Sequence, residues 1–240
     1  MKNLKFVIYF AALFIMSCEN DPGITPSVET FLPKIALKGS SKVVLPCGST
    51  TYADLGVDAT ENGQPAKVNT TISPRYFGSS TINTADVYDI SYVAINVDGI
   101  PGAAFRTVTI PPCNGDLVTN IEGSYSSTIF RNGVSAPQYT NVKTIYIKKI
   151  SGNTYQISDA IGGWYEFGRA LGFGYAAPGY KITANNIATN SFTFGPHIEV
   201  GGFGGELIMT DFKVDAAKKQ IVVTTDWEFG YTFVATLTQI

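Results

Sequence analysis

Short runs of β-forming residues, separated by turn residues, recur along the chain from about residue 35 to its end. Val87–Val97 is followed by Asp98-Gly99, and the run Val142–Ile150 is followed by Ser151-Gly152-Asn153. An Asp-Gly pair or a glycine-containing loop of three residues between two such runs is typical of a β-hairpin. The repetition of this local pattern predicts an antiparallel, all-β protein.

Two regions of strands are predicted. The first runs from Ile35 to Ile110, and its clearest strand, Val87–Val97, changes phase in the middle, which predicts a β-bulge. The second begins near Leu117 and contains about eight predicted strands, a number typical of an up-and-down barrel or a flattened, barrel-like sandwich. Its predicted segments are Ser124–Phe130, Val142–Ile150, Thr154–Ile157, Ser191–Phe194, Leu207–Val214, Gln220–Thr225 and Tyr231–Leu237.

The N-terminus predicts export. Lys2 and Lys5 precede an uncharged run of eleven residues, Phe6–Met16, and Ser17-Cys18 follow. This order of segments is typical of a secretory leader, and the run is shorter than the ~20 residues that a membrane-spanning helix needs. The segment Ile15–Cys18 resembles a bacterial lipobox, which implies that residues 1–18 are a signal peptide and that Cys18 is lipidated. The alternative is an ordinary leader in which the cysteine is accidental.

The residues after Cys18 predict the location of the protein. Glu19, Asn20 and Asp21 resemble the surface-export signal of Bacteroidota lipoproteins, which implies a lipid-anchored protein of the outer membrane that is exposed at the cell surface. Residues 19–33 contain Pro22, Gly23, Pro26 and Pro33 without a hydrophobic period, and we interpret them as a semi-extended tether.

Two further resemblances concern the domains. Tyr52, Asp54, Gly56, Val57 and Ala59, with a closing Arg106-Thr107-Val108-Thr109-Ile110 strand, resemble a bacterial immunoglobulin-like surface domain, which implies a β-sandwich over residues 34–115. Ile121–Tyr125 resembles the first strand of lipocalin-like domains, which implies an antiparallel, barrel-like or sandwich domain over residues 116–240.

The cysteine count is compatible with a disulfide. If Cys18 is lipidated, Cys47 and Cys113 remain, and an exported protein lies where disulfides persist. Two separate thiols are the alternative. The immunoglobulin-like resemblance favours the bridge, because it implies that the first and last strands of the sandwich are neighbours.

Several classes of function lack support in the sequence. The chain has 17 basic and 19 acidic residues, so it lacks the excess of positive charge that is typical of nucleic-acid-binding proteins. His197 is the single histidine, so a histidine-rich metal site is excluded, and no glycine-rich loop has the position of a phosphate-binding loop. We therefore predict no catalytic constellation, no metal and no cofactor.

One segment has a composition suited to sugar binding. Trp164, Tyr165, Glu166 and Arg169 lie between glycines, and Trp227 begins a similar aromatic cluster. Aromatic rings stack on the C–H face of a sugar, and carboxylate and guanidinium groups pair with its hydroxyls. The alternative is that these aromatic residues fill the interior of a glycine-rich barrel. Phe203, between two Gly-Gly pairs, is a weaker candidate.

The functional hypothesis combines these points. The layout resembles uncharacterised two-domain lipoproteins encoded near glycan-uptake systems in Bacteroidota. We therefore expect non-catalytic binding of polysaccharide or oligosaccharide for an outer-membrane uptake complex. A structural or protein-interaction subunit is the alternative, and a glycoside hydrolase is third, with candidate carboxylates that include Glu166, Glu199, Glu206, Asp211, Asp226 and Glu228.

Overall fold

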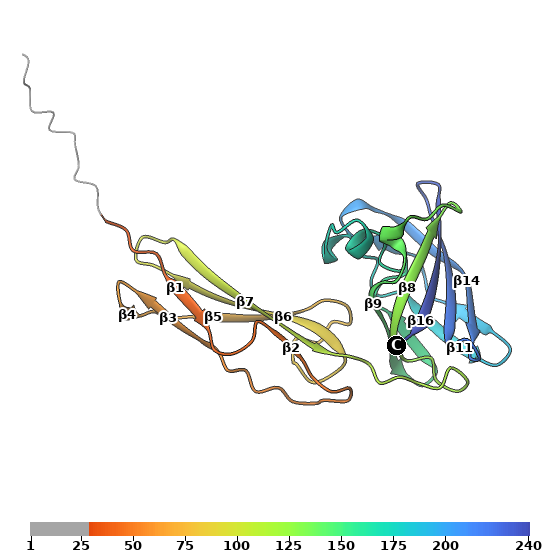
Figure 1. Ribbon diagram of the computed structural model, residues 1–240, viewed down its shortest axis with the longest axis horizontal. Coiled ribbons are helices and arrows are strands. Elements are labelled where there is room, and N and C mark those ends of the chain that lie inside the picture. The colour runs from red at the N-terminus through yellow and green to blue at the C-terminus, as the bar shows by residue number, and fades with distance from the viewer. Residues whose placement is uncertain (1–28) are drawn as a thin grey trace, which may run out of the picture. The chain divides into compact units, whose positions relative to one another are not determined.

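The computed structural model describes residues 29–240 (Figure 1). The predicted signal peptide 1–18, the lipidation site Cys18 and residues 19–28 of the predicted tether lie outside the described residues. Within 29–240, strands dominate and the helical segments are single turns, so the predicted all-β class is confirmed. None of these helical segments has the length and apolar character to cross a membrane.

The first part of the chain forms two small sheets. One has the strand order β1-β3-β4, and the other has the order β2-β7-β6-β5, with β2 parallel to β7. Their inward side chains form one hydrophobic cluster, which includes Tyr88, Ile90, Tyr92 and Val108. The bounds are β1 Lys34–Leu37, β2 Lys42–Val44, β3 Val57–Glu61, β4 Gln64–Pro65, β5 Asn69–Pro74, β6 Asp86–Ile95 and β7 Pro101–Ile110.

The predicted bulge in β6 is wrong. β6 pairs with β5 and with β7 in unbroken register from Asp86 to Ile95. Tyr88, Ile90, Tyr92 and Ala94 are buried, whereas Ile95 is exposed. The apparent change of phase arises because aliphatic residues also occupy the outward face of β6. The strand contains no extra residue, but the alternation of apolar and polar residues is obscured.

A buried arginine holds the loop before β3 onto the sheet. The Arg106 side chain, 1% exposed, forms an ion pair with Asp54, and Tyr92 donates a hydrogen bond to the same carboxylate at 2.6 Å. The Arg106 Nε–H donates to the Ser40 carbonyl oxygen at 3.0 Å. The residues that carry the immunoglobulin-like resemblance therefore serve the architecture of the sandwich.

The predicted Cys47–Cys113 disulfide is present. The two Cα atoms are 5.0 Å apart, and the bridge closes a sequence separation of 66 residues. Cys113 follows β7 and the Pro111-Pro112 pair, whose missing N–H groups end the strand. The bridge therefore ties the end of the sandwich to the loop that follows β2.

The second part of the chain is one curled, antiparallel sheet of nine strands that forms a half-barrel (Figure 1). The strand order is β12-β11-β10-β9-β8-β16-β15-β14-β13, and the edge strands β12 and β13 do not pair with each other. The bounds are β8 Gly123–Arg131, β9 Val142–Ser151, β10 Thr154–Ile157, β11 Lys181–Asn186, β12 Ser191–Phe194, β13 Ile198–Val200, β14 Gly204–Asp215, β15 Gln220–Trp227 and β16 Tyr231–Gln239.

Local signals predicted two hairpins of this sheet. Residues 152–153 connect β9 with β10 at the predicted turn Ser151–Asn153. Residues 216–219 connect β14 with β15, between the predicted strands Leu207–Val214 and Gln220–Thr225. Two short strands, β11 and β13, were not predicted, and together with the seven segments named from the sequence they make a sheet of nine strands rather than about eight.

The concave side of the half-barrel is filled by the chain itself. Between β10 and β11 the chain makes an inward excursion, with the single turns η2 (Trp164–Gly168) and η3 (Phe173–Tyr175). Ile161, Trp164 and Tyr165 belong to the same buried cluster as sheet residues such as Ile129 and Phe233. The turns η1 (Pro137–Tyr139) and η4 (Gly201–Phe203) flank this excursion.

Candidate functional site

The predicted sugar-binding segment is preceded by two positions, 162 and 163, that only glycine can occupy. Gly162 and Gly163 have φ angles of +67° and +90°. A Cβ on Gly162 would lie 2.6 Å from the Ala235 side chain, so the backbone passes directly against the sheet. This close approach places the next residues, the π-type turn η2, inside the half-barrel.

The aromatic residues of this segment are part of the core. The Trp164 side chain is 4% exposed, and its ring stacks on Tyr139 with 3.5 Å between the ring centroids. Tyr165 is buried as well, and its ring meets that of Trp227 edge-on at 6.0 Å. Trp227 is buried, and its Nε1–H donates to the Gly204 carbonyl oxygen at 3.1 Å. These three rings follow the core-filling alternative that the sequence left open.

Glu166 is also buried, and it joins the two parts of the chain. Residues Leu32–Ile240 form one compact unit, and within it Tyr76, from the loop between β5 and β6, donates its hydroxyl hydrogen to Glu166 Oε1 at 2.7 Å. The Tyr76 ring meets Phe173 edge-on at 5.3 Å. Burial raises the pKa of Glu166, while the Tyr76 hydrogen bond lowers it in part. Of the five predicted ligand residues, Arg169 alone is exposed.

A second buried carboxyl lies at the start of the excursion. Asp159 is fully buried, and one of its oxygens accepts hydrogen bonds from the backbone N–H groups of Ile161 and Ala177, at 3.0 and 3.1 Å. Its other oxygen has no hydrogen-bond partner among the described residues. Burial and the nearby Glu166 charge raise the pKa of Asp159 to about 7. The carboxyl therefore keeps its proton to a higher pH in the folded protein than an exposed aspartate does.

Two accessible aromatic residues, Phe203 and Phe229, lie next to the buried rings of Tyr165 and Trp227, and we call these two residues the aromatic rim. Their side chains are 43% and 56% exposed. The Phe203 ring centroid is 4.8 Å from that of Tyr165, and the Phe229 ring centroid is 4.8 Å from that of Trp227. The buried rings therefore form a layer that supports two exposed ones.

Glycines and carboxylates border the aromatic rim. A Cβ on Gly201 would lie 2.3 Å from the Gly174 carbonyl oxygen, so only glycine lets η4 pack against η3 and place Phe203. Glu206 and Glu228 are exposed and adjacent, since the Glu228 N–H donates to the Glu206 carbonyl oxygen at 3.0 Å. His197 Nε2 lies 3.6 Å from Glu206 Oε1. The rim thus combines two apolar rings with carboxylate acceptors.

Phe229 was missed as a separate candidate, although a signal for it exists. Trp227 pairs with Tyr231 across the β15–β16 hairpin, which leaves Glu228, Phe229 and Gly230 as the turn. Gly230 has a φ angle of +80°, a conformation that favours glycine. A three-residue turn ending in glycine predicts exposure of the residue before it.

Three of the six carboxylates considered for hydrolysis have other partners. Glu166 is buried against Tyr76, Asp211 forms an ion pair with Lys213 at 2.6 Å, and Asp226 accepts a hydrogen bond from Thr232 at 2.6 Å. Within residues 29–240, no cluster of three or more potential metal ligands occurs.

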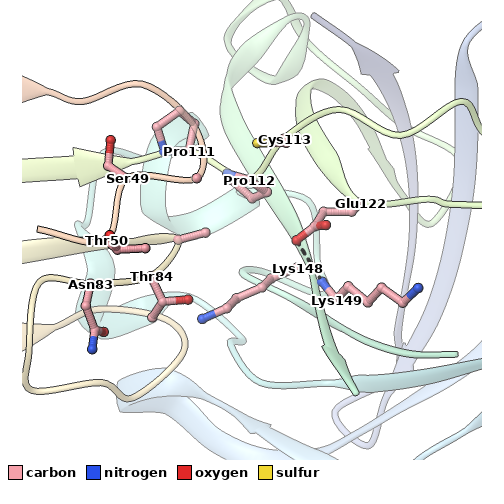
Figure 2. A pocket seen from close by; sticks show the side chains of 12 residues that line it. Ser49, Thr50, Asn83, Thr84, Pro111, Pro112, Cys113, Glu122, Lys148 and Lys149 are labelled. Carbon is pink, nitrogen blue, oxygen red and sulfur yellow. Dashed lines mark hydrogen bonds between the residues drawn. The ribbon is translucent and has the colours of Figure 1, made fainter. Parts of the chain in front are cut away.

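A cleft of about 290 Å³ lies where the sandwich meets the half-barrel (Figure 2). The sandwich contributes residues 48–50, 83–85 and 111–113, and the half-barrel contributes Glu122, Lys148 and Lys149. Figure 2 shows the Lys148 side chain extending toward Thr84 and Asn83, whereas the Lys149 side chain points the other way. The two adjacent lysines therefore have different surroundings.

The comparisons with known proteins agree with this architecture. A family model with the description "-like, C-terminal domain" matches residues 114–239. Among solved structures, the chain is similar to the crystal structure of the lipoprotein BT2262 from Bacteroides thetaiotaomicron, with a TM-score of 0.57 and 24% sequence identity, over 87% of this chain and 100% of that one. At this identity the similarity establishes the fold.

No curated protein gives a significant match. The family model, by contrast, covers just over half of the 240 residues, including the whole half-barrel and its aromatic rim. The chain therefore belongs to the family that this C-terminal domain model describes.

Proposed function

We propose that this protein is a non-catalytic lipoprotein, anchored by Cys18 in the outer membrane and exposed at the cell surface, that binds polysaccharide or oligosaccharide for a nutrient-uptake complex. The leader and its lipobox resemblance support the anchor, and the similarity to a Bacteroides lipoprotein is consistent with it. Neither the matched family nor the matched lipoprotein is named for an enzymatic activity.

The aromatic rim is the observation that carries the binding function. Phe203 and Phe229 are large apolar side chains that remain 43% and 56% exposed although a buried aromatic layer lies directly beneath them. Sugars bind by placing their C–H faces on such rings and their hydroxyls against carboxylates. The adjacent Glu206 and Glu228 supply those acceptors.

This proposal changes the roles of the residues predicted from the sequence. Tyr165 and Trp227 support the rim from the core, and Trp164 packs in the core against Tyr139. Glu166 fixes the excursion to the sandwich through Tyr76. Arg169 is exposed after η2 and keeps its proposed role as a polar contact. Sugar binding therefore depends directly on the two phenyl rings and only indirectly on the buried ones.

Affinity electrophoresis through gels that contain individual polysaccharides tests this proposal, followed by titration with oligosaccharides of any glycan that retards residues 19–240. Phe203→Ala and Phe229→Ala are each expected to weaken binding about 10-fold, since one stacked ring contributes roughly 0.5–1.5 kcal/mol beyond the area that it buries. Phe105→Ala is the matched control, because Phe105 is 63% exposed but lies on β7 of the sandwich. Retention of a glycan by the double variant Phe203→Ala/Phe229→Ala with unchanged affinity would contradict the proposal.

A protein-binding role is the second candidate, and the outward face of the β6–β7 hairpin favours it. Ile95, Val97 and Phe105 are 56%, 90% and 63% exposed. The register places Ile95 opposite Pro101 and Phe105 opposite Ser91, so Ile95 and Phe105 lie on one face of the hairpin. Exposed apolar side chains that share a face are typical of contact surfaces. If no glycan retards the protein, cross-linking in whole cells with a photoreactive residue at position 105 tests this role.

A further inference from the structure

The cleft between the sandwich and the half-barrel contains a half-buried lysine without an acidic partner. Lys148 lies near the end of β9, and no carboxylate lies within ion-pair distance of its ammonium group among the described residues. Its Nζ atom lies over the Phe77 ring, at 5.2 Å from the centroid. The positive charge is thus held against an apolar ring and directed into the cleft (Figure 2).

The acidic groups near Lys148 are engaged elsewhere. Both Asp86 carboxylate oxygens accept backbone hydrogen bonds, from Tyr76 N–H at 3.0 Å and from Phe77 N–H at 2.8 Å. Glu122 Oε1 accepts a hydrogen bond from the Lys149 N–H at 3.1 Å. Burial lowers the pKa of Lys148 in spite of the opposing effect of Asp86 and Glu122. A negatively charged group in the cleft would therefore meet a lysine that forms no direct ion pair with a carboxylate of the described residues.

The sandwich adds four polar side chains to the lining of the cleft. Ser49, Thr50, Asn83 and Thr84 place hydroxyl and amide groups around the cleft, and the Cys47–Cys113 disulfide with Pro111-Pro112 restrains its wall. Its volume of about 290 Å³ is close to the lower limit of small-molecule pockets, ~300 Å³. This volume suits a single ring or a short acid with several hydroxyl groups.

We propose that the cleft is a second binding site, in which the Lys148 ammonium group pairs with the carboxylate of a small hydroxylated acid. The hydroxyl and amide groups from the sandwich then bind the hydroxyl groups of that ligand. Such a carboxylate occurs on a uronic acid residue of a glycan and also on a free organic acid. The site does not include Phe203 or Phe229, so this inference goes beyond the proposed function and can fail independently of it.

Isothermal titration of residues 19–240 tests the inference with three probes: the sodium salt of methyl galacturonide, sodium gluconate and methyl galactoside. Methyl galacturonide, which has one ring, one carboxylate and several hydroxyl groups, is expected to bind. The neutral methyl galactoside is not expected to bind in this cleft, and added salt is expected to weaken the ionic contact. Binding of methyl galacturonide alone assigns the site to a glycan, whereas binding of gluconate assigns it to free hydroxy acids. Absence of binding by both carboxylates would overturn the proposal.

The adjacent lysines provide a matched pair of variants. A hydrogen bond to a charged group is worth roughly 1.5–3 kcal/mol, so Lys148→Met is expected to weaken carboxylate binding by about 10-fold or more. Lys149→Met is expected to change the affinity less than about twofold, because its side chain points away from Thr84 and Asn83. Lys148→Arg is expected to restore part of the affinity, and thermal unfolding of each variant checks that the fold is intact. Equal affinity of the Lys148→Met variant and the unsubstituted protein would also overturn the proposal.

Discussion

Replacement of Trp164 by alanine distinguishes a core residue from a ligand-binding one. The Trp164 side chain is 4% exposed and stacks on Tyr139, and the Arg131 guanidinium lies 4.9 Å from its ring centroid. Truncation of a buried tryptophan removes its transfer free energy and leaves a cavity, which together cost about 3–5 kcal/mol. This loss is a large part of the ~5–15 kcal/mol that stabilises a typical domain.

Urea unfolding followed by circular dichroism is the assay for this prediction. Intrinsic fluorescence is unsuitable, because Trp164 is one of only two tryptophans. We expect a lower midpoint with an unchanged slope, and the loss in unfolding free energy to be about 4 kcal/mol. Phe229→Ala is the control, since Phe229 is 56% exposed and its replacement is expected to cost less than about 1 kcal/mol.

The same variant also tests the assignment of the binding surface. If Trp164 lies in the core, the molecules of Trp164→Ala that remain folded at low temperature are expected to bind glycan with nearly unchanged affinity. A stability loss below about 1 kcal/mol combined with a loss of binding would refute the reasoning, because that result is expected of an accessible ring on the ligand.

Two further predictions concern the disulfide and the buried carboxyls. Cys47→Ser/Cys113→Ser is expected to lower the unfolding free energy by about 4 kcal/mol, because the bridge closes a loop of 66 residues, and urea titration without reductant measures this; a midpoint equal to that of the unsubstituted protein would contradict it. Asp159 has a folded-state pKa of about 7, above its ordinary value of 3.8, so the folded state binds more protons than the unfolded state between these two values. The unfolding free energy is therefore expected to fall as the pH rises from about 4 to about 7, by at most ~1.4 kcal/mol per pH unit. Asp159→Asn is expected to flatten that pH dependence, and a profile as steep as before would show that another group is responsible.

Local signals were sufficient for the hairpins of this fold. The turn residues Ser151–Asn153 and the chain between β14 and β15 specify their connections through neighbours in the sequence. β13 has three residues and lies beside glycines and Pro196, so it offers too few positions for alternation to emerge. β6 is long enough for alternation to emerge, but it has aliphatic residues on both faces, so its two-residue period is not visible in the sequence.

The roles of the candidate site residues depended on contacts that no local pattern contains. Glu166 and Tyr76 are 90 residues apart in the sequence, and the buried Glu166 carboxyl accepts its hydrogen bond from Tyr76. Glycine-rich segments such as Gly162–Gly168 have no hydrophobic period, so the sequence could identify the aromatic residues but not the side of the sheet on which they lie. The composition therefore indicated both a sugar site and a filled interior, and the packing selected the interior for Trp164 and Tyr165.

The filled interior constrains where any ligand can bind. A lipocalin-like barrel holds its ligand among the strands, but here residues between β10 and β11 occupy the concave side, and Ile161, Trp164 and Tyr165 close it with their own side chains. A ligand could enter only by displacing this excursion, which is fixed to the sheet at Gly162 and to the sandwich at Glu166. Loss of that packing would cost several kcal/mol, more than a weak surface ligand repays. The proposed recognition is therefore expected outside the interior of the half-barrel, at surfaces such as the aromatic rim and the cleft beside Lys148, where binding leaves the core intact.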